Sequence, residues 1–202
     1  MTKPSHREKI LTEGLKVVHE RGFAGASVRD IVQAAGVPQG SFTNHFMSKE
    51  AFGLEIIDLY FDAARQVVDQ TLLNPGLSPV ARVVAYIDIH RCTLEQDVHK
   101  GCLLGNFTAE STEHSEPIRL RLVQIYDWLT STIASCLDDA INQGDLSANL
   151  DSRQVALFIL SSLQGALLLA KAQRTLATLE SFSAVLTNDV LRLHPPVSNA
   201  QG

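Results

Sequence analysis

The stretch SVRDIVQAAGVPQGSFTNHF, residues 27–46, decides the fold of this chain. It opens on Ser27, whose hydroxyl can cap a helix, and Asp30 follows three positions later, as in a capping box with the shorter acid. Apolar residues then recur at helical spacing until Gly36 interrupts them. The first half of the stretch therefore predicts a short helix that ends in a tight turn.

The second half predicts another short helix directly after that turn. Pro38 suits the first turn of a helix, and Phe42 and Phe46 stand four positions apart on one face of it. Upstream, an apolar stripe over residues 10–18 that stops at Gly22 predicts one more helix. Three helices, the last two joined by a glycine turn, are the layout of a helix-turn-helix, whose later helix enters the major groove of DNA.

The rest of the chain also shows helical periodicity, and no segment alternates convincingly with the period of a strand. Further helices are expected to begin near Ser48, Ser78, Cys102, Ile118, Ser152 and Leu179. The last of them should end at Pro195. The sequence thus predicts an all-α fold of about nine helices.

The composition is that of a folded globular protein, with 45% hydrophobic and 19% charged residues among 202. Three cysteines without a CxxC pair argue against a disulfide framework and a structural zinc site, and we expect free thiols and no cofactor. The first residues lack the apolar stretch of a secretory signal, and the longest apolar run, around residues 165–170, is too short to cross a bilayer. We therefore expect a cytoplasmic protein without a membrane span.

The charge is distributed unevenly along the chain. The net charge is −5, but residues 1–50 carry seven Lys and Arg against five Asp and Glu, and the remainder carries ten against seventeen. A mildly basic head on an acidic body suits a small DNA-reading module attached to a part that does not touch DNA.

The expected helix over residues 152–174 is apolar almost all round, which predicts that it is covered on more than one side. A second subunit is one source of that cover, and the central position of a core helix in a monomer is the alternative. Four residues on this helix are small enough to permit the close approach of another helix: Ser161, Ser162, Gly165 and Ala166.

The head resembles the TetR/AcrR family of repressors in its glycines, caps and apolar positions, which fall in register over about 45 residues. The matching segments are Gly22-Phe23, Ser27-Val28-Arg29-Asp30-Ile31, Ala34-Ala35-Gly36-Val37-Pro38-Gln39-Gly40-Ser41-Phe42 and His45-Phe46-Met47-Ser48-Lys49-Glu50-Ala51. The resemblance implies a homodimeric DNA-binding regulator, most simply a repressor, that a small-molecule effector releases from a palindromic operator.

The resemblance also implies which residues bind DNA. Gln39, Gly40, Ser41 and Asn44 are expected on the exposed side of the short third helix, where the two amides suit base edges and the glycine permits a close approach. Lys49 and His45 are expected to bind phosphates. Ser27 and Thr43 are further candidates for backbone contacts, although family members usually have Tyr where this chain has Thr43.

The same resemblance divides the chain into a DNA-binding domain over residues 1–50, a ligand-binding and dimerisation domain over residues 51–196, and a disordered tail over residues 197–202. In this family the last two long helices usually form a four-helix bundle with those of the partner.

A narrower resemblance lies at Gly101-Cys102-Leu103-Leu104-Gly105-Asn106, with Ala170-Lys171 much later in the chain. It is similar to a subgroup of the family that responds to small electrophiles or unsaturated acids. A thiol at a helix start is favoured as the thiolate, which makes Cys102 a candidate sensor, and an approach of Lys171 would favour the thiolate further.

Core packing is the alternative for each residue of this candidate sensor site. Free cysteine is often buried, and we expect Cys92 and Cys136, on apolar helical faces, to belong to the core. Asn106, Phe107, Tyr126 and Trp128 can line an apolar pocket with one polar anchor, but each is equally explicable as core. Lys171 can instead extend to the surface.

Two other readings of the chain are weaker. A metal site from His90, Cys92, His99 and Cys102 is rejected, because residues 90 and 92 of one helix point to nearly opposite sides. The sequence contains no nucleophile–base pair or glycine-rich phosphate loop, which argues against an enzyme. A helical protein-interaction module without DNA binding is the remaining alternative.

Overall fold

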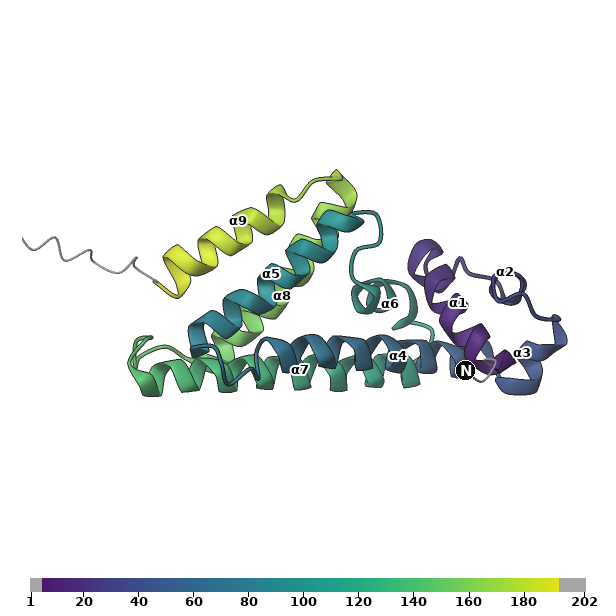
Figure 1. Ribbon diagram of the computed structural model, residues 1–202, viewed down its shortest axis with the longest axis horizontal. Helices are drawn as coiled ribbons and strands as arrows, with labels where there is room; N and C mark the ends of the chain where they lie inside the picture. The colour runs from purple at the N-terminus through teal and green to yellow at the C-terminus, as the bar shows by residue number, and fades with distance from the viewer. Residues whose placement is uncertain (1–4, 193–202) are drawn as a thin grey trace, which may run out of the picture. The chain divides into compact units, whose positions relative to one another are not determined.

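A computed structural model describes residues 5–192, and this part of the chain is entirely helical, as the sequence predicts (Figure 1). It contains nine α-helices and one π-helical turn that follows the last of them. The bounds are α1 His6–Arg21, α2 Val28–Ala34, α3 Gly40–His45, α4 Lys49–Gln70, α5 Pro79–Gln96, α6 Leu103–Ser111, α7 Glu116–Gln143, α8 Ser152–Gln173, α9 Ala177–Val185 and η1 Leu186–Val190.

Most helix ends lie where the sequence predicts them. Ser27 caps α2 in a complete capping box with Asp30, and the Ser48 hydroxyl accepts a hydrogen bond from the Ala51 amide at 3.0 Å. Ser78 caps α5. Gly22 ends α1 with a φ of 78°, a conformation that glycine adopts without strain. These local signals are confirmed because each needs only neighbouring residues.

Two predicted boundaries are wrong. Pro38 precedes α3 rather than lying in its first turn, because its carbonyl accepts from the Ser41 amide in the turn that leads into the helix. The last α-helix stops at Val185, where the chain widens into the π-helical turn. The predicted stop at Pro195 and the tail beyond it lie outside the described residues.

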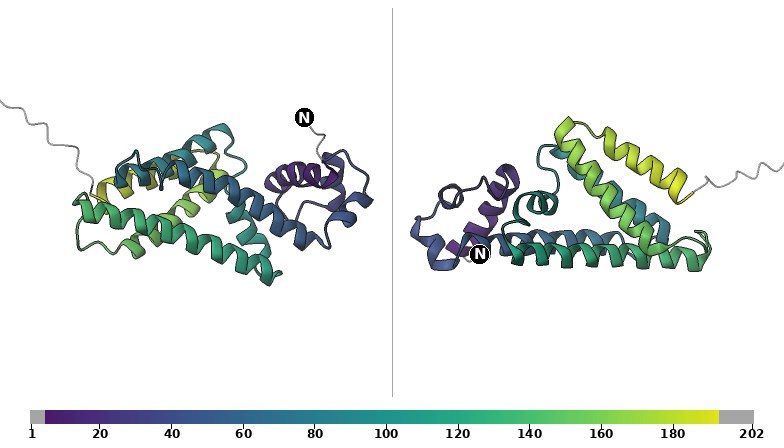
Figure 2. Two further views of the ribbon diagram at one scale, coloured as in Figure 1. Left: turned by 60° about the horizontal axis from the view of Figure 1, so that its bottom comes forward. Right: turned by 180° about the vertical axis from the view of Figure 1, so that it is seen from behind.

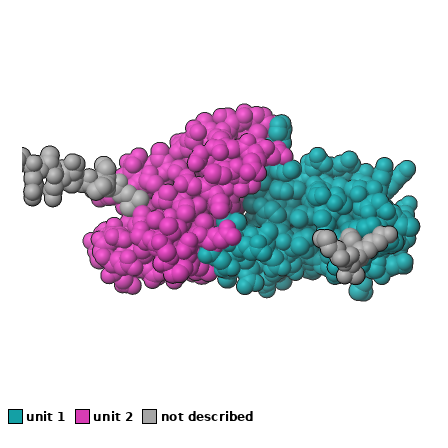
Figure 3. Space-filling model, viewed as in Figure 1, with its two compact units in different colours: residues 1–69, 99–129 teal, residues 70–98, 130–202 magenta. Residues whose placement is uncertain are grey.

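The described helices belong to two compact units, which are treated separately (Figure 3). Unit 1 comprises residues 1–69 and 99–129, and unit 2 comprises residues 70–98 and 130–202. The division passes through α7, whose first half belongs to unit 1 and whose second half belongs to unit 2.

The head of unit 1 consists of α1, α2 and α3, which pack around three phenylalanine rings. The centroids of Phe42, Phe46 and Phe52 lie 5.2–5.3 Å from one another, and all three side chains are buried. Gly14 of α1 makes room for them, because a Cβ atom there would lie 2.6 Å from the Phe52 ring. The start of α4 thus completes the core of the head.

Within unit 1, α4 and the first half of α7 run side by side (Figures 1 and 2). Arg121 of α7 donates to Asp58 of α4 at 2.7 Å, and Trp128 packs edge-on against Phe61 with the ring centroids 5.2 Å apart. The ion pair is exposed and contributes little, so the apolar contact holds these helices together.

Unit 2 contains α5, α8 and α9 with the second half of α7. Its core is aliphatic, and it includes the fully buried Val83, Leu163 and Leu179. Long apolar side chains of α8 and α9 also remain on the surface of unit 2: Leu157, Phe158, Leu168, Leu169 and Val185.

The helix α8 is more apolar as a whole than its longest uninterrupted apolar run indicates. Its 22 residues are long and apolar enough to cross a bilayer by length and composition, and 39% of the most apolar window is buried in the protein. The apolar run over residues 165–170 is short, but the Ser and Gln residues around it lower the mean hydropathy of the helix only slightly. A core helix can have the same length and composition.

Replacing Asp30 by Asn should make the chain less stable at neutral pH and affect it little in acid. The Ser27 hydroxyl lowers the pKa of Asp30 below its ordinary value of 3.8, with a smaller contribution from Arg21. Because the pKa of Asp30 is lower in the folded state, its carboxylate stabilises the fold at pH values above the unfolded-state pKa. This contribution is lost as the pH falls through the folded-state pKa. Urea unfolding of both proteins at pH 7 and pH 3 measures the effect, and an equal difference at both values would contradict it.

Candidate functional site

The helix α3 presents a row of polar side chains on its outer side. Gln39, Thr43, Asn44 and His45 are exposed, while Phe42 faces the core and anchors the helix. The Thr43 hydroxyl donates to the Gly40 carbonyl at 3.1 Å. The two amide side chains offer donors and acceptors of the kind that read base edges.

Ser41 does not belong to this outer row, and its predicted exposure is wrong. Its side chain is buried, and its hydroxyl lies 3.3 Å from Nδ1 of His6 on α1. The physical reason is that Ser41 and Phe42 fall on the side of α3 that packs toward α1. The sequence contains no local sign of this contact, because the two residues are 35 positions apart.

Gly40 has an open space where other residues have a side chain. A Cβ atom built there meets nothing within 4 Å, and the backbone is not in the left-handed conformation that favours glycine. Neither packing nor backbone geometry within the chain therefore requires a glycine. A glycine at this position would instead allow another molecule to come close to the first residue of α3.

Ser27 and Lys49 flank the head and are both held by neighbours. The Ser27 hydroxyl accepts from the Asp30 amide and donates to the Asp30 carboxylate. The Lys49 ammonium lies 3.4 Å from the Ala24 carbonyl and 4.8 Å from the centre of the Phe23 ring. Burial lowers the pKa of Lys49, and the negative charge of Glu110 opposes that shift.

Met47 is a candidate contact residue that sequence reasoning missed. Its side chain is fully exposed in the short turn between α3 and α4, beside the outward polar row. A fully exposed methionine is unusual for an apolar side chain, but no spacing rule singles out a residue in such a turn.

Cys102 lies where the sequence predicts it, at the N-cap position of α6, although its thiol makes no capping hydrogen bond. It is half-buried, and its carbonyl accepts the Asn106 amide at 3.0 Å, while the Asn106 side chain donates to the Lys100 carbonyl at 3.3 Å. Cys102 also lies close enough to Tyr126 to help raise the pKa of that phenol, which burial brings to about 12.

The other predicted sensor residues do not all gather around Cys102. Asn106 joins it, whereas Phe107 is fully buried against Phe23 and Trp128 packs on Phe61. Cys102 belongs to unit 1 and Lys171 to unit 2, so the approach of this lysine to the thiol stays a prediction.

The expectation that the other two cysteines belong to the core is right for one and wrong for the other. Cys136 is buried, its thiol donates to the Pro79 carbonyl at 3.1 Å, and burial raises its pKa to about 11. Cys92 is exposed. The buried face of α5 carries Val83, Ile87 and Leu94, and Cys92 lies on the other side of the helix.

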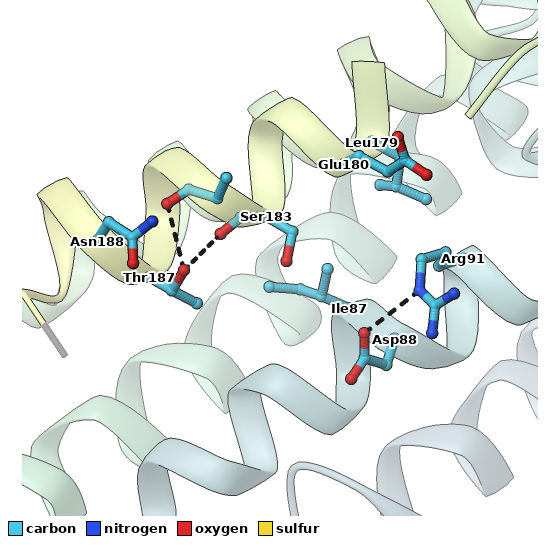
Figure 4. Close-up of a pocket in the computed structure, with 9 residues that line it drawn as sticks. Ile87, Asp88, Arg91, Leu179, Glu180, Ser183, Thr187 and Asn188 are labelled. Atoms are coloured by element: carbon cyan, nitrogen blue, oxygen red, sulfur yellow. Dashed lines mark hydrogen bonds and ion pairs between the residues drawn. The ribbon is translucent and has the colours of Figure 1, made fainter. Parts of the chain in front are cut away.

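A hollow of about 390 Å³ lies in unit 2 between α5 and the α9–η1 segment (Figure 4). Arg91 is a positively charged residue that lines the hollow. Its guanidinium pairs with Asp88 at 3.6 Å and with Glu95 at 2.6 Å. Because two carboxylates of its own helix neutralise Arg91, we assign no anion site to this hollow.

His90, also on α5, carries a buried ring nitrogen. Its Nε2 has no hydrogen-bond partner in the described part of the chain, and burial lowers its pKa to about 4. The ring is therefore neutral at pH 7 and packs edge-on against Tyr86. Within residues 5–192, no three His, Cys, Asp or Glu side chains gather closely enough to hold a metal ion.

A helix-turn-helix with an outward polar face, followed by a larger helical part, defines a DNA-binding transcriptional regulator. Residues 10–56 match the bacterial regulatory proteins of the tetR family, and residues 79–186 match the tetracyclin repressor-like C-terminal domain. The chain belongs to the TetR family.

Similar proteins cover nearly the whole chain. The HTH-type transcriptional repressor DhaR of Mycobacterium sp. (strain GP1) is 33% identical over 98% of this chain and 99% of its own length. The regulatory protein TetR from Rhodobacter sphaeroides has a TM-score of 0.84 and 28% identity over 89% of this chain and 96% of that one. The reduced form of NemR from E. coli has a TM-score of 0.83 and 27% identity over 91% and 95%.

Replacing Gly40 by Ala should weaken operator binding without weakening the fold. Alanine is the better helix former and meets no atom of the chain, so thermal stability should stay equal or rise. The added methyl group should hinder the approach of DNA and lower affinity by about tenfold, which is 1.4 kcal/mol. Operator titration and thermal unfolding of the same samples measure both effects. Unchanged operator affinity would show that no close approach occurs at Gly40.

Proposed function

We propose that this TetR-family regulator is a homodimeric repressor that leaves a palindromic operator when Cys102 is modified or a small molecule binds. The observation that carries the effector part is the position of Cys102 at the start of α6, in the unit that contains the head. The domain division follows from this proposal, with residues 1–50 binding DNA and residues 51–196 responsible for dimerisation and sensing. A cytoplasmic location fits a protein whose partner is DNA.

The operator is read by the outer row of α3. Gln39 and Asn44 offer side-chain amides to base edges, and the open Gly40 lets the helix start lie close to DNA. Thr43 and His45 on the same helix and Lys49 at the start of α4 contact phosphates. Ser41 and Ser27 support these contacts indirectly, because the Ser41 hydroxyl is engaged inside the head and the Ser27 hydroxyl caps α2.

The dimer is formed by the exposed apolar face of α8 and α9. A groove of about 550 Å³ runs between these helices, and its lining includes Phe158, Gly165, Leu169 and Val185. Gly165 is exposed in the middle of α8 with nothing within 4 Å of its Cβ position. A glycine there weakens the helix by about 0.5–1 kcal/mol relative to alanine, and the close approach of a partner helix explains its presence. Burying this apolar face against a second copy removes it from water.

Placing an arginine at position 165 should convert the dimer into monomers. The long charged side chain would fill the groove between α8 and α9 and would be buried without a partner in the interface. Sedimentation velocity over a concentration series measures the change. Gln143→Arg, an exposed position at the end of α7, is the control with the same change of charge and should remain dimeric. A Gly165→Arg protein that sediments as the dimer would place the interface elsewhere.

Cys102 is the proposed site of effector chemistry. It is half-buried at the start of α6, whereas Cys136 is buried and its thiol donates to the Pro79 carbonyl. A thiolate adds to the β-carbon of an unsaturated carbonyl compound, forms a carbon–sulfur bond, and leaves the α-carbon to take a proton from water. The similar NemR structure is of a reduced form, which accords with a thiol-based response in this part of the family.

Treatment with methyl vinyl ketone should release wild-type protein from its operator and leave Cys102→Ser bound. The serine keeps the size of the side chain but does not form the adduct. Fluorescence anisotropy on an operator selected from genomic fragments gives the affinity, and intact mass gives the number of adducts. Cys92→Ser is the matched control, because Cys92 is exposed but lies on α5, and it should respond like the wild type. Equal release of wild type and Cys102→Ser would return Cys102 to a packing role.

A further inference from the structure

Within unit 1, α6 contacts the head at three places along its length. At its start, Nε2 of His19 lies 3.0 Å from the Gly101 carbonyl oxygen. In its middle, the Phe107 ring lies 4.9 Å from the Phe23 ring. Near its end, the Glu110 carboxylate accepts a hydrogen bond of 3.0 Å from the Ala24 amide. The turn between α1 and α2 is therefore held by a residue that lies 86 positions away in the sequence.

The turn is shaped to accept the Glu110 carboxylate. Gly22 has a φ of 78°, and a Cβ atom there would stand 2.5 Å from one carboxylate oxygen and 2.8 Å from the other. A side chain at position 22 would therefore displace Glu110 or strain the backbone. Both the conformation and the space at Gly22 match the presence of this acid.

The same turn holds Lys49. Its ammonium lies 3.4 Å from the Ala24 carbonyl oxygen, on the peptide next to the amide that Glu110 binds, and it sits over the Phe23 ring. An ammonium group has three donors, and the Ala24 carbonyl engages one of them, so the group can also donate to a phosphate. The negative charge of Glu110 favours the charged form of this lysine.

A second contact involves the residue next to Lys49. The hydroxyl of Ser115, the residue before α7, donates to the Glu50 carboxylate at 2.6 Å. Lys49 and Glu50 are the first two residues of α4 and directly follow the turn that leaves α3. The segment between α6 and α7 thus holds Glu50, the neighbour of Lys49 at the start of α4.

We propose that Glu110 is a positioning residue for DNA binding, which places Lys49 for a phosphate both by its negative charge and by holding the Gly22–Ala24 turn that Lys49 contacts. This inference rests on the proposed phosphate contact of Lys49. A long side chain that is already ordered loses less freedom on binding than one that moves freely, so the ordered lysine strengthens the complex. Glu110 itself touches no DNA in this arrangement.

The inference and simple charge repulsion predict opposite results. DNA is a polyanion, so the removal of an acid that merely lies nearby should strengthen binding. The removal of an acid that positions a phosphate-binding lysine should weaken binding instead. Glu110→Gln separates the two, because glutamine keeps the acceptor for the Ala24 amide and removes the charge that Lys49 faces.

The experiment measures operator affinity of the full-length protein at several salt concentrations. Glu110→Gln should bind about three- to tenfold more weakly than wild type and lose about one from the slope of log affinity against log salt. Glu113→Gln, an exposed acid three positions away, is the matched control and should bind as well as wild type or better. Glu110→Asp, which keeps the charge, should restore the wild-type slope. Thermal unfolding establishes that each variant is folded.

The Lys49→Ala background identifies the route. Glu110→Gln should have no further effect there, since the lysine that it positions is gone. An equal loss in both backgrounds, or an affinity of Glu110→Gln at or above that of wild type, would overturn the inference. If Lys49→Ala alone leaves the slope unchanged, the phosphate contact itself is wrong. The inference fails in a different way from the proposed function. If Lys49→Ala weakens binding and Glu110→Gln does not, the phosphate contact is right and only the role of Glu110 is wrong.

Discussion

The packing of three phenylalanine rings holds the DNA-binding head together. Helices as short as α2 and α3, with seven and six residues, are not stable in water by themselves. They persist because Phe42, Phe46 and Phe52 share one buried cluster, to which α4 contributes the last ring. The outward direction of Gln39 and Asn44 follows from this arrangement, since the buried rings determine which side of α3 is left for solvent and for DNA.

The parts of the fold that were predictable from sequence depend on neighbouring residues. Serine caps, the glycine stop at the end of α1 and the helical periods all act within a few positions, and the structure confirms them. Errors arose where a distant contact decides. Ser41 is buried by His6, and Cys92 is exposed because the apolar stripe of α5 lies on its other side. Periodicity indicates that a helix has a buried face, but it places residues at the edge of that face poorly.

The candidate site shows the same division. The motif around Cys102 predicted its place at the start of α6, because a glycine and a capping position are local features. The contact between Glu110 and the Ala24 amide was not predictable, since the residues lie 86 positions apart and no local motif near either one indicates it. The structure therefore adds a connection between the head and α6 that no motif contains. Because α6 has only nine residues, Cys102 before its first residue lies about two helical turns from Glu110, which contacts the head.

Gly40 has a consequence for how such a protein evolves. Because a larger side chain at this position meets no atom of its own chain, folding does not select against one. Random substitution would tend to replace the glycine with a residue that suits a helix better, and the resulting protein would be as stable and as soluble as before. Under the proposed contact with DNA, such a substitution would be disadvantageous only through weaker operator binding. The constraint on position 40 would then come from the operator and not from the fold.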